Sequence, residues 1–205
     1  MIASSIAKKV GMAFTGLLLY GFLVGHMSGN LLLLRGDGGE AFNAYSAFLT
    51  SHPLLVPVEF GLVAIFVLHV VLAIAVSKEN RRARPERYAR TKAVGGRTWA
   101  SRSMIWTGLV ILVFVIIHLK TFKYGELGDG TLYDLVITTF HDSLYVSWYV
   151  AAMLLLGFHL WHALQSAFQT LGLSARQNLR RIGIVICFLI AGGFGLIPLW
   201  VYLRV

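Results

Sequence analysis

The chain has 205 residues, of which 57% are hydrophobic and 13% are charged, and its mean hydropathy is +0.73. Soluble domains carry about a quarter charged residues, so this composition excludes an ordinary soluble domain and indicates a chain that is solvated largely by lipid. The net charge of +9 is divided among loops that flank apolar runs, which argues against nucleic-acid binding and for contact with anionic headgroups.

Five apolar runs are long enough to cross a hydrocarbon core about 30 Å thick, which takes about 20 helical residues. The first run is too long for a signal peptide and lacks a small-residue cleavage site. We therefore predict an all-α integral membrane protein, one domain over residues 1–205 in which no internal repeat is detected. Its transmembrane helices are expected at about 11–34, 54–76, 104–122, 144–168 and 182–203.

The segments between these runs carry two further signals. The turn Gly36-Asp37-Gly38-Gly39 is followed by apolar residues on one helical face, from Ala41 to Leu49, which predicts a short interfacial helix. The segment Ser77–Ser103 is long and basic and contains Tyr88 and Trp99, as expected of a loop that receives a soluble partner.

The distribution of basic residues predicts the orientation of the chain. With the N-terminus in the cytoplasm and the C-terminus outside, only four of the 18 basic residues lie on the outer side: Arg35, Lys120, Lys123 and Arg204. Cytoplasmic loops of membrane proteins are enriched in Lys and Arg. We therefore expect a multi-pass protein of the cytoplasmic (inner) membrane, with its N-terminus inside.

Each of the first four predicted helices contains a histidine. Ionisable residues inside a bilayer are costly and mark functional sites. Counted at 1.5 Å per residue from the inner helix ends, His26 and His118 lie about 21–22 Å deep, and His69 and His159 about 10–14 Å deep. The four histidines therefore form two levels, about 10 Å apart, with one pair at each level.

Two histidines at equal depth on facing helices suit haem, whose iron takes one neutral imidazole nitrogen from each side of the porphyrin. We expect helices 1–4 to form a bundle around two haem b groups, the outer one held by His26 and His118 and the inner one by His69 and His159. His162 lies one turn after His159 and competes with it; its other expected roles are to bond a propionate or to face water.

Several short motifs lie along the chain: Ser4-Ser5-Ile6-Ala7-Lys8-Lys9, Gly25-His26-Met27, Gly29-Asn30-Leu31, Phe42-Asn43-Ala44-Tyr45, Phe158-His159-Leu160 and Ser166-Ala167-Phe168-Gln169-Thr170-Leu171-Gly172. With these motifs, essentially the whole chain resembles the cytochrome b subunit of succinate dehydrogenases and fumarate reductases, in its single-chain, five-helix, two-haem form. The resemblance implies the same four haem ligands. Some members carry a carboxylate two residues before the fourth-helix ligand, where this chain has Gly157.

The resemblance also implies partners and a reaction. The chain would anchor a flavoprotein subunit with FAD and an iron-sulfur subunit, and the complex would oxidise succinate with a quinone, usually menaquinone, or run in reverse. Electrons would pass through the iron-sulfur subunit to the inner haem and then to the outer haem. A higher oligomer of the complex is compatible with this arrangement.

Other polar residues have two interpretations each. Glu59, in the second helix near the outer surface, is expected either to exchange protons at a quinone site or to be an interfacial carboxylate. Arg102 and Lys120 are placed to bind haem propionates, or else to snorkel toward the interface. His52 and His141 are expected to be surface residues.

Other functions also fit parts of the pattern. The haem subunit of a hydrogenase or formate dehydrogenase likewise places histidines on transmembrane helices. A transporter or proton channel would use the histidines as a relay without haem. A purely structural anchor explains the basic inner loop but leaves four histidines at two matched depths unexplained.

Overall fold

The computed structural model describes residues 4–82, 99–173 and 177–204, apart from the side chains of residues 99–102 and 179. This part of the chain is helical and contains no strand. Its elements are α1 (Ser5–Asn30), the 3-10 turn η1 (Leu31–Leu34), α2 (Glu40–Ser51), α3 (Leu55–Arg82), α4 (Trp99–His118), the π turn η2 (Leu119–Lys123), α5 (Leu132–Phe140), α6 (Ser143–Thr170) and α7 (Gln177–Arg204).

Five of these helices are long and apolar enough to cross a membrane, which confirms the predicted all-α membrane protein with five spans. The spans run over Ser5–Leu34, Leu55–Arg82, Ser103–Lys123, Ser143–Thr170 and Arg180–Arg204. Some extend beyond the apolar runs because helices do not end where hydrophobicity does. At the start of α1, for example, the Ser4 hydroxyl caps the helix by accepting from the Ala7 amide at 3.2 Å.

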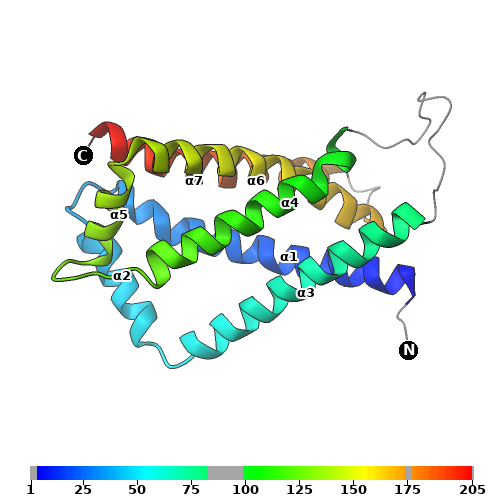
Figure 1. Ribbon diagram of the computed structural model, residues 1–205, viewed down its shortest axis with the longest axis horizontal. Helices are drawn as coiled ribbons and strands as arrows, with labels where there is room; N and C mark the ends of the chain where they lie inside the picture. The colour runs from blue at the N-terminus through cyan, green and yellow to red at the C-terminus, as the bar shows by residue number, and fades with distance from the viewer. Residues whose placement is uncertain (1–3, 83–98, 174–176, 205) are drawn as a thin grey trace.

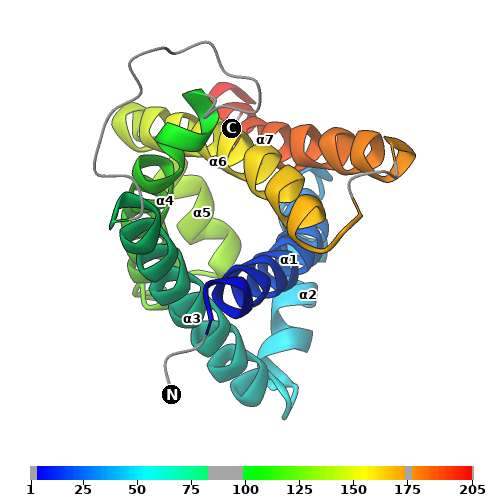
Figure 2. The ribbon, with the colours of Figure 1, turned by 90° about the vertical axis from the view of Figure 1, so that its right-hand side faces the viewer.

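The long helices run side by side, with the N-terminus at one end of the bundle and the C-terminus at the other (Figure 1). We call these the N-end and the C-end. Seen end-on, α1, α3, α4 and α6 surround a common axis, and α7 lies outside them against α6 and α1 (Figure 2). This ring of four helices is the part of the fold that positions the histidines.

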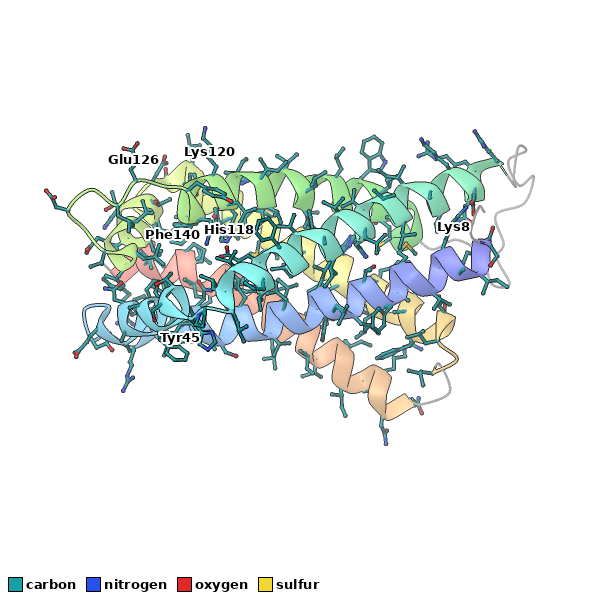
Figure 3. The ribbon with its side chains drawn as sticks, turned by 90° about the horizontal axis from the view of Figure 1, so that it is seen from below. Lys8, Tyr45, His118, Lys120, Glu126 and Phe140 are labelled. Carbon is teal, nitrogen blue, oxygen red and sulfur yellow. The ribbon has the colours of Figure 1, made fainter. Side chains whose placement is uncertain are left out.

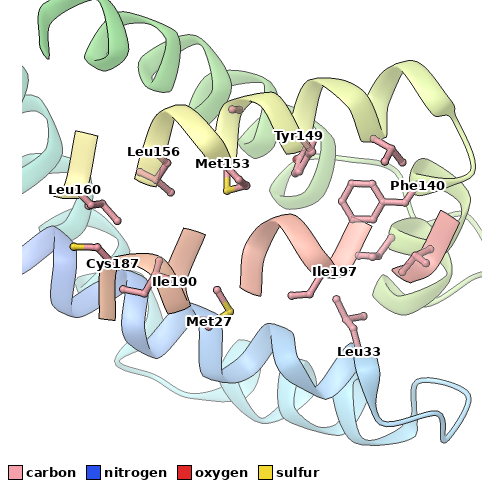
Figure 4. Packing of buried hydrophobic residues seen from close by; sticks show 14 of the residues in the cluster. Met27, Leu33, Phe140, Tyr149, Met153, Leu156, Leu160, Cys187, Ile190 and Ile197 are labelled. Carbon is pink, nitrogen blue, oxygen red and sulfur yellow. The ribbon is translucent and has the colours of Figure 1, made fainter. Parts of the chain in front are cut away.

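The hydrophobic core lies on the α6–α7 side of the bundle (Figure 4). In the apolar stretch of α6, 33% of residues are buried, against 6% for each of the spans containing α3 and α4. Small residues bring α6 and α7 together: a Cβ on Gly157 would lie 2.9 Å from the Ala191 Cβ, and one on Gly183 would lie 2.2 Å from Leu164 Cδ2. The α6–α7 pair therefore forms the protein-packed part of the fold.

Helix α3 is joined to its neighbours by ion pairs at both ends. At the N-end, Glu79 pairs with Lys8 of α1 and accepts from the Ser5 hydroxyl at 2.9 Å. At the C-end, Glu59 pairs with Lys123 of the π turn η2. Between these ends α3 packs mainly against α1, so the pairs fix the two ends of a helix that has little protein around it.

The C-end carries two short helices. Helix α2 confirms the predicted short helix, although only Phe42 of its apolar face is buried and Phe48 is 63% exposed. Helix α5 was not predicted, because its nine residues are too few for a membrane span. A capping box starts it: the Thr131 hydroxyl accepts from the Asp134 amide, and the Asp134 carboxylate accepts from the Thr131 amide.

One asparagine joins these two short helices. The Asn43 side chain in α2 donates to the Thr131 hydroxyl at 3.1 Å and accepts from the Tyr133 amide at 3.1 Å. Both bonds reach the start of α5, so Asn43 ties that end of α5 to α2.

Replacing Asn43 by Leu is expected to loosen the start of α5 without unfolding the bundle. Because each hydrogen bond contributes about 1 kcal/mol net, amides in the first turn of α5 should exchange with deuterium roughly fivefold faster or more. Asn178→Leu, at an exposed position in the first turn of α7, is the matched control. Unchanged exchange in α5 would show that Asn43 does not hold it.

The capping box formed by Thr131 and Asp134 should weaken in acid. Hydrogen bonds from the Thr131 hydroxyl and amide hold the pKa of Asp134 below its usual value. Because the pKa is depressed in the folded state, the cap stabilises α5 above the unfolded-state pKa, and this stabilisation is lost as the pH falls through the folded-state pKa.

Candidate functional site

The structure brings the four predicted histidines together as two pairs. His26 of α1 faces His118, the last residue of α4, with ring centroids 5.8 Å apart and ring planes at 89°. His69 of α3 and His159 of α6 lie close enough to interact electrostatically. The first pair lies toward the C-end and the second toward the N-end. Each of the four helices around the central axis contributes one of these imidazoles.

Aromatic rings surround the C-end pair. The His26 ring stacks on Phe22, with ring centroids 5.3 Å apart, and its centroid lies 5.6 Å from that of Phe194 in α7. The His118 ring stacks on Phe114, with ring centroids 5.7 Å apart. Its Nδ1 atom lies 3.0 Å from the Tyr149 hydroxyl of α6. A single hydroxyl therefore serves His118 in otherwise aromatic surroundings.

The N-end pair is held by two threonines. Nδ1 of His69 lies 3.1 Å from the Thr15 hydroxyl of α1, and Nδ1 of His159 lies 3.1 Å from the Thr107 hydroxyl of α4. Thr15 and Thr107 are only 4% and 7% exposed. The two contacts have the same distance and chemistry, although they come from different helix pairs.

A glycine follows each of these threonines and leaves room for the imidazole. A Cβ on Gly16 would lie 3.2 Å from Cε1 of His69, and a Cβ on Gly108 would lie 3.4 Å from Cε1 of His159. The first distance is shorter than an ordinary contact of a Cβ atom, and the second is at its lower limit. Each Thr-Gly pair therefore bonds the ring on one atom and lets it lie against the helix backbone.

Sequence reasoning missed Thr15, Thr107 and Tyr149, although a signal for the threonines was present. Thr15-Gly16 precedes His26, and Thr107-Gly108 precedes His118, with the same spacing of eleven residues from Thr to His. This short motif occurs twice in a chain in which no repeat was detected. Tyr149 has no comparable signal, because a tyrosine at the membrane interface is commonplace.

The remaining predicted site residues lie away from the paired imidazoles. His162 is half-buried one turn from His159, which is the residue that reaches Thr107. Glu59 is 38% exposed at the C-end, in its ion pair with Lys123. Lys120 is exposed and points away from the bundle (Figure 3). The side chain of Arg102 lies outside the described part of the structure.

His52 and His141 end α2 and α5 and are exposed, as expected of surface residues. His52 Nδ1 accepts a hydrogen bond from the Leu54 amide at 3.2 Å, which shapes the turn into α3. Both histidines belong to the C-end surface rather than to the paired site.

Chemically, the site offers two pairs of imidazoles from facing helices. An imidazole nitrogen is a common metal ligand when neutral, and the other ring nitrogen usually bonds a polar group that orients the ring. Three of the four histidines have such a hydroxyl at Nδ1. Each pair could therefore supply two imidazole nitrogens to a metal-containing group.

Comparisons of the chain with protein-family models, with curated proteins and with solved structures found no match. The site itself consists of two histidine pairs, to which four of the five helices that are long and apolar enough to cross a membrane contribute one histidine each.

Proposed function

We propose that this chain is a di-haem cytochrome b subunit that anchors a succinate:quinone oxidoreductase, a succinate dehydrogenase or fumarate reductase, in the cytoplasmic membrane. The observation that carries the proposal is the pairing of His26 with His118 and of His69 with His159 at two levels of one bundle. The motifs that resemble this family add the identity of the reaction.

The spacing of His26 and His118 suits two imidazoles that would share one iron. Two imidazoles that share one metal ion through bonds of about 2 Å have ring centres roughly 6 Å apart, and the centroids of His26 and His118 are separated by 5.8 Å. In this proposal His26 and His118 hold one haem b, and His69 and His159 hold the other. Bound haem supplies a one-electron carrier in a site that apolar side chains shield from water.

The low burial of α3 and α4 agrees with this assignment. Both spans are mostly apolar, yet only 6% of their apolar stretches are buried by protein, and α3 and α4 make little contact with each other. Each carries an imidazole whose Nδ1 reaches a hydroxyl on a neighbouring helix. A flat cofactor between the helices would give these two helices a packing partner that the protein itself does not supply.

The proposal includes an orientation. The N-end faces the cytoplasm, because Lys and Arg concentrate there. The flavoprotein with FAD and the iron-sulfur subunit would dock on that face, next to the His69–His159 pair. Quinone, proposed to be menaquinone, would react near the C-end and the His26–His118 pair.

Glu59 is the proposed proton-exchanging group for quinone at the C-end. Its carboxylate is half-exposed and paired with Lys123, so it can exchange protons with water. Quinone chemistry couples electrons to protons, which requires such a group near the aqueous boundary. Lys123 holds the carboxylate in place between α3 and the π turn η2.

The first test is a dithionite-reduced minus oxidised visible spectrum of the purified protein, with haem quantified per chain. We expect two b-type haems per chain and co-purification with an FAD-binding protein. A colourless protein would refute the cytochrome and favour a haem-free proton relay. Haem with a hydrogenase or formate dehydrogenase partner would refute the succinate assignment only.

Replacing His69 by Ala should remove the N-end haem and leave the C-end haem largely in place, so that the haem content falls from two per chain to about one. His162→Ala is the matched control, one turn from the proposed ligand His159, and should retain both haems. If His69→Ala keeps both haems, the ligand assignment is wrong.

Glu59→Gln should slow electron transfer to quinone by roughly tenfold to a hundredfold or more, as expected when a proton-transfer group is removed. Succinate oxidation with an artificial acceptor that draws electrons from the flavoprotein should be unaffected. Glu126→Gln, another exposed carboxylate at the C-end, is the control. Equal quinone rates in both variants would exclude Glu59 from the proton path.

A further inference from the structure

Helices α1 and α4 carry the same functional pattern. In each, a Thr-Gly pair is followed by a histidine eleven residues after the threonine: Thr15 with His26, and Thr107 with His118. Eleven residues are close to three helical turns, so the threonine and the histidine face the same side, about 16 Å apart along the helix. Each of the two helices therefore serves both levels, bonding an imidazole at the N-end level and supplying one at the C-end level.

The direction of the threonine hydrogen bonds follows from the number of hydrogens. The Thr15 hydroxyl donates to a carbonyl of its own helix, Gly11 at 2.9 Å or Met12 at 3.1 Å, and the Thr107 hydroxyl donates to Met104 at 3.1 Å. A hydroxyl has only one hydrogen to donate but two lone pairs. When that hydrogen goes to the carbonyl, the hydroxyl oxygen accepts toward the imidazole, and the ring donates from Nδ1.

In this arrangement both rings are the same tautomer. With hydrogen on Nδ1, the neutral imidazoles of His69 and His159 each keep a lone pair on Nε2, the atom that can bind a metal. A hydrogen-bond acceptor at Nδ1 also raises the basicity of the ring as a ligand. The buried threonines thus act on the donor strength of the imidazoles as well as on their orientation.

We propose that Thr15 and Thr107 are positioning residues for the N-end haem, holding His69 and His159 as Nδ1–H tautomers and lowering the reduction potential of that haem. The inference rests on the proposed function. A more basic imidazole stabilises the ferric state more than the ferrous state, so each threonine hydrogen bond favours the oxidised form.

The C-end pair provides an internal reference. There His118 bonds the Tyr149 hydroxyl, and the His26 ring lies among Phe22, Phe194 and His118. Neither threonine bonds this pair. A change at Thr15 or Thr107 should therefore alter one haem and leave the other as a built-in control.

The test uses Thr15→Val and Thr107→Val, singly and combined, in the complete complex. Valine keeps the shape of threonine and removes the hydroxyl; Thr15→Ser and Thr107→Ser keep the hydroxyl. The readouts are haem per chain and a potentiometric titration followed in the visible spectrum. We expect the valine variants to favour the ferrous form of the N-end haem by about tenfold each, which is about 59 mV for a one-electron couple.

The serine variants should behave as the unmodified protein, and the potential of the C-end haem should not move in any variant. Loss of the N-end haem from the valine variants, with retention in the serine variants, would also support a role for the hydroxyl. An unchanged potential in the double valine variant, or equal loss of haem from valine and serine variants, would overturn the inference. An unmodified protein without haem would overturn the proposed function instead, before any variant is compared.

Discussion

The structure depends on one constraint: a polar ring placed in hydrocarbon must find its hydrogen-bond partners inside the protein. Three of the four imidazoles have such a partner on a neighbouring helix. His69 and His159 take buried threonine hydroxyls, and His118 takes the Tyr149 hydroxyl. Because each partner belongs to a neighbouring helix, every such bond also fixes one helix against another. The polar site therefore also helps to hold the four helices of the ring together.

The helices on the two sides of the bundle are held in different ways. The α6–α7 pair is closely packed through Gly157 and Gly183 and gives the bundle its rigid side. On the other side, α3 is joined to α1 and to the π turn η2 by the ion pairs of Glu79 and Glu59. Charges at the bundle ends can reach water, so this tether does not require a buried ion pair.

Much of this arrangement follows from the sequence alone. Helix rise and the position of each apolar run were enough to group His26 with His118 and His69 with His159. The depth of a residue in the membrane depends only on its distance along the helix, which can be counted from the sequence. The partners of the rings were not predictable in that way: which face a threonine presents depends on the crossing of two helices. Helix α5 was missed because it is too short for a membrane span, and because its capping box at Thr131 is a signal shared with many surface turns.

The π turn that follows His118 has a mechanical consequence. In η2 the Tyr124 amide bonds the Leu119 carbonyl at 3.0 Å, five residues back, so this turn holds one residue more than a regular helical bond. The wider turn changes the angular phase of the chain directly after the histidine. Lys123 therefore faces Glu59 of α3, while His118, only five residues earlier, faces His26. The π turn thus lets one short segment serve both the ion pair at the C-end and the buried imidazole pair.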